Sequence, residues 1–216
     1  DEIYSLIHKL QPNCLIGNNH HMTPFEGEDF QMFEKDLPGQ NKSGLNFQKA
    51  SEHIPVEVCE TMNNSWGFNL NDDHYKTVKD LVHLLVNSAG RNTNLLLNVG
   101  PEPNGMIQHE FRDTLQKIGE WMRENGQTIY GTRGLYIQPQ SWGVATIKGK
   151  TLYLHILKRP GDNTLIIPEW TDKVAALKVF NSTQKVPFKI ISGQLKIDLK
   201  DVIVNDTDTI LEVQLR

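Results

Sequence analysis

The stretch from Asn94 to Gly105, NLLLNVGPEPNG, constrains the fold of this chain more than any other. Three consecutive leucines form a short apolar run, which glycine and proline residues then interrupt. Such a run is typical of a strand buried on both faces of a sheet. Amphipathic stretches precede it at His74–Ser88 and follow it at Ile107–Glu124, which predicts a parallel α/β architecture. In such folds the loops after the strands face the ligand, so Asn98 and the residues up to Gly105 are expected at a functional rim. The alternative is a buried strand with a tight turn and no chemistry.

Two other strands are expected upstream. Cys14–Gly17 precedes the polar residues Asn18–His21 and a long connection, which we expect to be a functional loop, to about His53. Ile54–Thr61 precedes a loop that carries Trp66. These units resemble part of a (β/α)8 barrel, which needs eight of them, so about half of such a barrel would be absent from these residues.

The pattern changes after Gly134. Short runs of alternating apolar residues are separated by turn residues, as at Lys148–Lys150 and Ser192–Gln194. This pattern predicts an antiparallel β-sandwich. The expected organisation is therefore α/β plus all-β: residues 1–132 form the C-terminal half of a (β/α)8-like barrel, and residues 133–216 form the sandwich.

Composition excludes several classes of protein. With 38% hydrophobic and 22% charged residues, the 216-residue chain can bury a core. Its net charge is −4, and without a basic patch nothing points to nucleic acid. No apolar run reaches the length of a membrane span, and no signal-peptide layout is visible. Cys14 and Cys59 are expected to be buried free thiols.

Three polar groupings could carry chemistry. The first is Asn18, Asn19, His20 and His21. Because adjacent residues of an extended chain point in opposite directions, we expect one histidine in a site and the other packed outside it. A sugar is favoured over a metal, because no Asp or Cys stands at helpful spacing.

The second grouping is Glu26, Glu28, Asp29 and Glu34, in a segment where phenylalanines alternate with acids. Burial against aromatic rings raises the pKa of a carboxyl group, as a general acid requires, although a solvated acidic loop is the plainer interpretation.

The third grouping is Glu57 and Glu60 in IPVEVCET. A carboxylate in an apolar strand needs a partner or a task, and a structural ion pair would also satisfy it. Trp66 could stack on a sugar ring. Carboxylates at strand ends beside an aromatic platform suggest glycoside hydrolysis, which uses two carboxyl groups.

At this point the chain resembles the α-L-fucosidases of glycoside hydrolase family 29. The matching segments are LIGNNHH (Leu15–His21), FEGEDFQMFEKDLPG (Phe25–Gly39), VEVCETMNNSWGF (Val56–Phe68), NLLLNVGPEPNG (Asn94–Gly105) and GEWMRENGQTIYGT (Gly119–Thr132). The resemblance implies a catalytic barrel followed by a β-sandwich. It also implies retaining hydrolysis of terminal α-L-fucose from glycans, without metal or organic cofactor. Family substrates imply a secreted, periplasmic or lysosomal location.

The family's nucleophile is an aspartate in a W-x-D-G-like motif, which these residues do not contain. We therefore expect the nucleophile and the N-terminal half of the barrel to lie outside this sequence, so that the fragment alone would be inactive. The resemblance makes Glu57 the first candidate for the acid/base and Glu28 the second. It makes Asn19, His20 and His21 candidates for binding the sugar hydroxyls, and Trp66 a wall against the fucose methyl group.

A non-catalytic carbohydrate-binding or scaffold protein is the alternative. It predicts exposed aromatic residues clustered on one face of the sandwich, with Tyr136, Trp142, Tyr153 and Trp170 as candidates.

Overall fold

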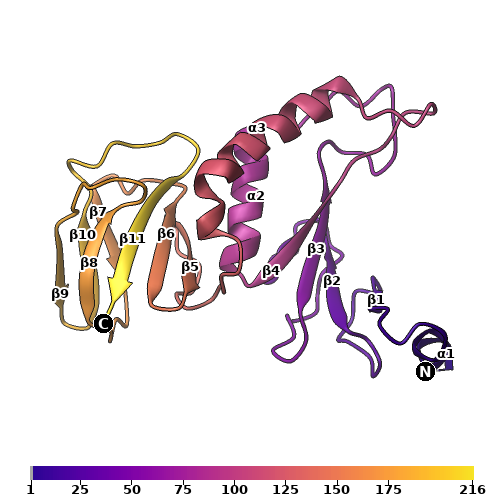
Figure 1. The fold of residues 1–216 in the computed structure, drawn as a ribbon, viewed down its shortest axis with the longest axis horizontal. Coiled ribbons are helices and arrows are strands. Elements are labelled where there is room, and N and C mark those ends of the chain that lie inside the picture. The colour runs from indigo at the N-terminus through magenta and orange to yellow at the C-terminus, as the bar shows by residue number, and fades with distance from the viewer. Residues whose placement is uncertain (1) are drawn as a thin grey trace. The chain divides into compact units, whose positions relative to one another are not determined.

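The computed structural model of the chain describes residues 2–216, which divide into two compact units. The first unit comprises the residues up to Lys76 together with Asn92–Leu115. The second comprises Thr77–Arg91 together with Gln116–Arg216. Parallel strands occur in the first unit and antiparallel strands in the second (Figure 1).

The first unit is built on a parallel sheet with the strand order β1-β2-β3-β4 (Figure 1). Its strands are β1 (Gly17–Asn18), β2 (Phe30–Glu34), β3 (Val56–Thr61) and β4 (Thr93–Asn98), and helix α1 (Glu2–Leu10) precedes them. Because all four strands run in the same direction, their carboxyl ends lie along one rim of the sheet. The parallel sheet expected from the sequence is therefore present.

The strand register sorts the side chains onto two faces of the sheet that differ in burial. On one face, Phe33 and Val58 are paired and completely buried. The other face, called the open face below, carries one row of Glu34, Cys59 and Leu96 and a deeper row of Met32, Glu57 and Asn94. Leu96 is 49% exposed. The prediction that the leucine run is buried on both faces is therefore wrong for this chain, because successive side chains of β4 alternate between a covered and an open face.

Two other expectations about the strands need correction. The strand expected at Cys14–Gly17 lies later, at Gly17–Asn18. The segment from Asn18 to His53, expected to be a loop, contains β2. The long connection after β2 is held to the sheet by two side chains. Asn46 bonds both the backbone N–H and the carbonyl of Glu34, and Gln31 bonds the backbone of Lys49 and Ser51.

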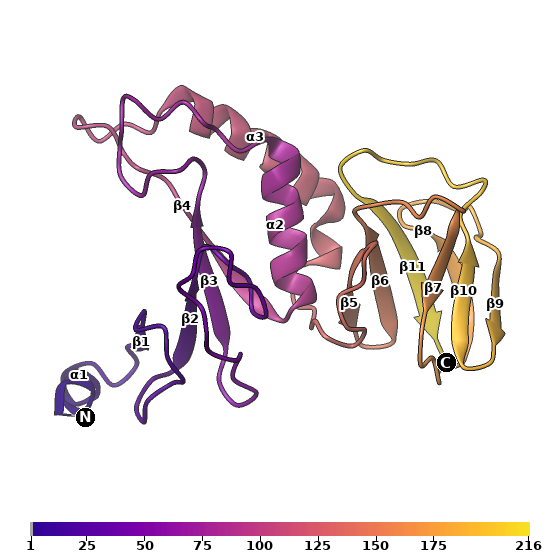
Figure 2. The same cartoon turned by 180° about the vertical axis from the view of Figure 1, so that it is seen from behind.

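The second unit contains two antiparallel sheets, with the strand orders β7-β10-β9 and β5-β6-β11-β8 (Figure 2). The strands are β5 (Gly143–Lys148), β6 (Thr151–Ile156), β7 (Thr164–Ile167), β8 (Val174–Val179), β9 (Phe188–Ile191), β10 (Gln194–Asp198) and β11 (Thr209–Leu215). Leu154 and Leu211 from one sheet and Leu165 and Ile197 from the other belong to one completely buried core. The second unit therefore contains the expected sandwich.

Helix α2 (Val78–Gly90) covers the outer face of the β5-β6-β11-β8 sheet. It begins with a capping box, in which the Thr77 hydroxyl accepts from the Asp80 N–H and the Asp80 carboxylate accepts from the Thr77 N–H. Val82 and Val86 of this helix pack on Val144 of β5. Helix α3 (His109–Asn125) begins in the first unit and ends in the second, and the short 3₁₀ helix η1 (Gly126–Thr128) follows it.

Candidate active site

Of the residues singled out from the sequence, Asn19, His21, Trp66 and Asn98 lie at the rim formed by the carboxyl ends of the parallel strands, whereas Glu28 and Glu57 do not. Asn19 and His21 follow β1, Glu34 ends β2, and Trp66 lies in the loop after β3. Asn98 ends β4 and lies beside Thr61 on the open face. Ligands of open parallel sheets bind outside the carboxyl ends of the strands. This rim is therefore the candidate active site.

Glu34 is the carboxylate at the centre of this rim. Its Oε2 accepts a hydrogen bond from the Asn19 side-chain amide at 2.7 Å and lies 3.8 Å from Nε2 of His21. The Glu34 side chain is 18% exposed, so its position is set by its partners yet solvent still reaches it. Among the described residues, Asn19 Oδ1 and His21 Nδ1 lack a hydrogen-bond partner. Buried polar atoms without partners are rare, and a bound water or a ligand hydroxyl would satisfy both.

Two residues near Glu34 have a left-handed backbone: His21, which faces its carboxylate, and Lys35, which follows it in the chain. His21 has φ = 58° and Lys35 has φ = 62°. Residues other than glycine adopt this conformation at a cost of about 1–3 kcal/mol, and such residues cluster at functional sites. The turn at Lys35 follows Glu34 directly, where β2 leaves the sheet. The sequence alone did not single out Glu34 among its acidic neighbours. The available signal was the phenylalanine-rich, mostly apolar run FQMF before Glu34, which is typical of a strand ending in a carboxylate.

Glu28 lies in an enclosed position, with its side chain 1% exposed. Its carboxylate accepts from the Tyr4 hydroxyl at 2.9 Å and the Phe25 N–H at 3.1 Å, and lies 2.9 Å from Nε2 of His20. The His20 ring in turn stacks on Phe25 at 4.4 Å between centroids. These contacts join helix α1 to the loop before β2. The two adjacent histidines thus face different carboxylates, His20 facing Glu28 and His21 facing Glu34.

Glu57 is the second residue of β3, so it lies near the start of that strand and not at its end. It shares the open face with Glu34 but belongs to the deeper row, two residues or about 6.6 Å farther from the rim. Burial raises the pKa of the Glu57 carboxyl above its ordinary value. Glu60 points to the opposite face, where it forms the ion pair that was the alternative for this grouping, with Lys76 at 3.4 Å.

The loop that carries Trp66 is fixed by polar contacts at both of its ends. The Lys76 ammonium donates to the carbonyls of Thr61 and Asn63, each at 2.7 Å. Asp72 accepts from the Ser65 hydroxyl at 2.7 Å, which is the main reason that the pKa of its carboxyl is lowered. Trp66 itself is 37% exposed. The loop therefore presents a partly exposed indole at the rim.

The stretch Asn94–Gly105 also supports the Trp66 loop. The side-chain amide of Asn98 donates to the Trp66 carbonyl at 2.7 Å. A Cβ atom at Gly100 would lie 2.4 Å from the backbone carbon of Gly67, so only glycine allows this close approach. The Lys35 ammonium lies 5.8 Å from the centroid of the Trp66 ring, within cation–π range. The rim thus combines an amide, an imidazole, a carboxylate, an ammonium and an indole.

Cysteine chemistry does not contribute to this rim. Cys59 shares the row of Glu34. Its burial and then the negative charge of Glu34 raise the pKa of the thiol to about 11, so the thiol stays protonated at neutral pH. Both cysteines are free, Cys59 buried and Cys14 half-buried. Across residues 2–216, no group of three His, Cys, Asp or Glu side chains is arranged to hold a metal ion.

Comparison with known proteins assigns the family. A family model described as Alpha-L-fucosidase matches residues 1–127. The chain belongs to the alpha-L-fucosidase family. Human plasma alpha-L-fucosidase is 33% identical over 119 residues, which cover 51% of this chain and 26% of that protein. Rat tissue alpha-L-fucosidase is 28% identical over 196 residues, which cover 76% of this chain and 42% of that protein.

Solved fucosidases share the fold over the full length of this chain. Alpha-L-fucosidase isoenzyme 1 from Paenibacillus thiaminolyticus superposes with a TM-score of 0.81 at 32% identity, covering 100% of this chain and 53% of that one. The alpha-fucosidase of Thermotoga maritima gives a TM-score of 0.74 at 23% identity and shows likeness of fold alone. The family member described here therefore spans about half the length of these solved relatives.

The sandwich lacks the exposed cluster of aromatic residues that the carbohydrate-binding alternative predicts. Trp142, Tyr153 and Trp170 are 5%, 2% and 5% exposed and lie within the hydrophobic clusters of the second unit. Tyr136 is 42% exposed, and its hydroxyl donates to Asp172 at 2.6 Å. The four aromatic residues therefore form no exposed cluster. Separately, the helices found between residues 2 and 216 are all too short or too polar to cross a membrane.

Proposed function

We propose that the protein carrying this chain is a retaining exo-α-L-fucosidase that acts on fucosylated oligosaccharides or glycoconjugates. In this proposal residues 1–132 are the C-terminal half of its catalytic barrel, and residues 133–216 are a sandwich domain. The missing half of the barrel supplies the nucleophilic aspartate. The observation that carries the proposal is the rim at the carboxyl ends of the parallel strands, in a chain of this family.

The proposed mechanism divides the work between two carboxyl groups. The aspartate from outside this chain attacks the anomeric carbon and forms a glycosyl-enzyme intermediate. A glutamate of this chain protonates the leaving oxygen and then removes a proton from the water that releases fucose. Asn19 and His21 hydrogen-bond the sugar hydroxyls, and Trp66 packs against the fucose methyl group. His20 lies between Asn19 and His21 in the chain, and its contact with Glu28 holds this segment in place. No step in this scheme uses a metal or an organic cofactor.

Among the glutamates, we propose Glu34 as the acid/base. It lies at the rim and is held by Asn19, whereas Glu57 lies one row deeper and Glu28 is enclosed by three partners. Glu57 remains the alternative, because its raised pKa favours a proton donor. Glu28 then has a supporting role, in which it fixes His20.

The experiment compares Glu34→Gln, Glu57→Gln and Glu28→Gln in the protein that carries this chain. Turnover is measured on an aryl fucoside with a good leaving group and on a fucosylated glycan. We expect Glu34→Gln to lower kcat/KM on the glycan by about 10²–10⁴-fold. The loss of kcat/KM on the aryl fucoside should be smaller, since its leaving group needs no proton, whereas kcat should still fall because the same glutamate activates the water.

Azide separates loss of proton transfer from loss of folding. Because azide needs no general base, it should restore turnover of the aryl fucoside in the variant that lacks the acid/base, and the product would be a fucosyl azide. Full glycan activity in Glu34→Gln, with azide-rescued loss in Glu57→Gln, would instead assign the role to Glu57. Unchanged glycan turnover in all three variants would refute the mechanism for this chain.

The proposal includes a location. The fucosylated substrates imply a secreted, periplasmic or lysosomal protein, and a relative is described as a plasma enzyme. Fractionation of the source cells, with the activity assayed in each compartment, tests this part independently.

A further inference from the structure

Four Asn-x-Ser/Thr triplets, at Asn41, Asn63, Asn181 and Asn205, are not used by the proposed fucosidase mechanism. Each matches the acceptor sequence for N-linked glycans. A glycan becomes attached to the side-chain nitrogen Nδ2, so a folded chain tolerates it only where that atom faces solvent. The structure separates the four triplets on this criterion.

Two of the triplets are less suited to a glycan in the folded chain. Asn63 is 2% exposed, and its side-chain oxygen accepts from the Thr61 hydroxyl and the Ser65 N–H. A glycan there would have to displace the loop that carries Trp66. Asn181 is exposed, but its Nδ2 donates to the Glu124 carbonyl at 3.0 Å, so only one of its two hydrogens is free for attachment.

Asn41 is exposed and less restricted. Its side-chain oxygen accepts from the Asn46 N–H at 2.9 Å. The hydroxyl of Ser43, the third residue of the triplet, donates to Asp36 at 2.6 Å. Both ends of this triplet therefore contribute to holding the loop after β2, and recognition of the Ser43 hydroxyl would break one of its contacts.

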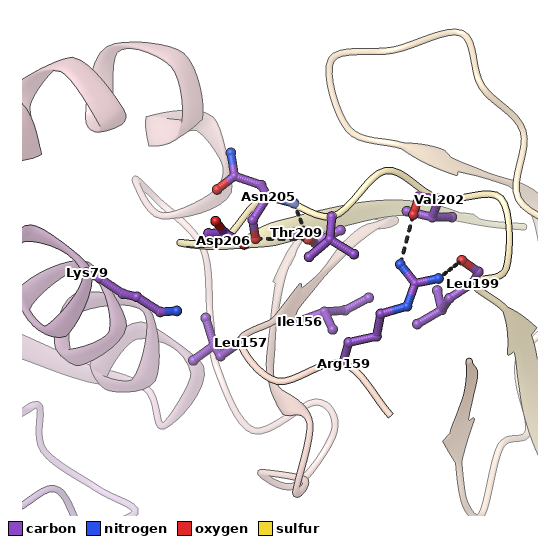
Figure 3. Close-up of a pocket in the computed structure, with 10 residues that line it drawn as sticks. Lys79, Ile156, Leu157, Arg159, Leu199, Val202, Asn205, Asp206 and Thr209 are labelled. Carbon is purple, nitrogen blue, oxygen red and sulfur yellow. Dashed lines mark hydrogen bonds between the residues drawn. The ribbon is translucent and has the colours of Figure 1, made fainter. Parts of the chain in front are cut away.

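Of the four triplets, all within the described residues, only that of Asn205 has an exposed asparagine whose Nδ2 makes no hydrogen bond and a third residue, Thr207, whose hydroxyl makes none. Its side-chain oxygen accepts from the N–H groups of Thr207 at 2.9 Å and Asp208 at 3.3 Å. Within residues 2–216, no hydrogen bond involves its Nδ2 or the Thr207 hydroxyl. Asn205 lies at the edge of a cavity of about 140 Å³, and Figure 3 shows its side chain pointing away from the Arg159 guanidinium.

The turn that carries Asn205 is fixed in place. The Arg159 guanidinium donates to the carbonyls of Leu199 and Val202, and His83 Nε2 lies 2.6 Å from the carbonyl of Thr207. The backbone N–H of Asn205 donates to the Thr209 hydroxyl at 2.9 Å (Figure 3). Because these contacts use backbone groups and not the two acceptor side chains, a glycan can be carried here without cost to them.

We propose that Asn205 is an N-glycan acceptor when the chain passes through a eukaryotic secretory pathway. The donor is a lipid-linked oligosaccharide diphosphate. A bond forms between Nδ2 of Asn205 and the anomeric carbon of the donor sugar while the bond from that carbon to the diphosphate oxygen breaks. The lipid diphosphate leaves with the electron pair, and Nδ2 loses one proton.

The test is a pair of substitutions in the protein that carries this chain, secreted from cultured eukaryotic cells. Thr207→Ala destroys the triplet without removing any described hydrogen bond, and Thr207→Ser preserves it. Glycopeptide mass spectrometry is compared before and after treatment with peptide-N-glycosidase. We expect the Asn205 peptide to carry a glycan in the wild type and in Thr207→Ser and to lose it in Thr207→Ala, with fucoside turnover unchanged in all three.

An unmodified Asn205 peptide in the wild type, from cells that glycosylate a co-expressed reporter, would overturn the proposal. A glycan on Asn63 in the folded, secreted protein would overturn the criterion on which it rests. Fucosidase activity is measured on the same samples, so failure of the proposed enzyme function is scored separately.

Discussion

Glu28, Glu34 and Glu57 show how surroundings give the same side chain different roles. Glu28 has three hydrogen-bonding partners and almost no exposure, so it connects helix α1 to the site. Glu34 has one close partner and reaches solvent at the rim. Glu57 has a raised pKa, as a general acid requires, but it lies near the start of β3, away from the rim. The sequence shows all three glutamates, but burial separates Glu28 from the others, and strand register separates Glu34 from Glu57.

Glu57 makes stability depend on pH. Burial raises the pKa of this group above its ordinary value of 4.5, so the folded state binds the proton more tightly than the unfolded state does. The resulting contribution to stability is full below the ordinary value and is lost as pH rises through the folded-state pKa. Glu57→Gln removes this dependence. The stability of the variant relative to wild type should therefore be higher at about pH 7 than at about pH 4. Denaturant titrations at the two pH values check this, and an equal difference at both would contradict it.

A buried pair of ionisable residues supports the sandwich. His155 and Asp208 are completely buried with 2.7 Å between Nδ1 and Oδ2, and the Thr146 hydroxyl lies 3.3 Å from the other ring nitrogen. Removal of one member leaves the other buried without its partner. We expect Asp208→Ala to lower the unfolding free energy by about 3–5 kcal/mol.

The matched control for this pair is Asp201→Ala. The Asp201 side chain is exposed, so its removal should change the unfolding free energy by less than about 0.5 kcal/mol. Chemical denaturation followed by circular dichroism measures both variants. Equal effects of the two substitutions would show that the buried pair contributes nothing specific.

At the scale of elements, the loops after β3 and β4 depend on each other. The backbone of Gly67 packs on Gly100, and Asn98 holds the carbonyl of Trp66. We predict that Gly100→Ala displaces the Trp66 loop and lowers kcat/KM on a fucoside by about 10²-fold, as a misplacement near 1 Å can. The melting temperature should fall less than it does for Asp208→Ala. Gly67→Ala is the control, since its added methyl group would meet no atom within 4 Å. Wild-type activity in Gly100→Ala would show that the close approach has no part in catalysis.

Some elements could be predicted from the sequence and others could not, for physical reasons. Periodicity located β4, α2 and α3 to within a few residues, because long apolar patterns outweigh local exceptions. It missed β2, where glycine and acidic residues before Phe30 resemble a loop. It also placed Glu57 at the end of a strand, because a strand's direction and neighbours depend on residues far away in the chain. For the same reason, Glu34 at the rim became visible only when β1 and β2 were paired.

At the scale of the whole molecule, the two units differ in how their strands are buried. Leu154 of β6 and Leu211 of β11 are completely buried between sheets, whereas Leu96 of β4 is half exposed on an outer strand. For the 216-residue chain, we therefore predict that backbone amides of β6 and β11 exchange with solvent at least about tenfold more slowly than those of β4. Hydrogen–deuterium exchange with mass spectrometry measures all three strands. Equal protection would show that the parallel sheet is as stable as the sandwich.

The segment from Asp36 to Pro55 illustrates how such a molecule could acquire new specificity. It starts two residues after Glu34, the last residue of β2, and hydrogen bonds of Asn46 and Gln31 hold it to the sheet. An insertion between Asn46 and Lys49 would lengthen the loop beside the site without moving a strand. Such a loop would change which branched glycans reach the site. One residue inserted within β2 would turn Glu34 to the covered face. Variation among descendants of this chain should therefore accumulate in the length of that segment, while the spacing from Phe30 to Glu34 stays fixed.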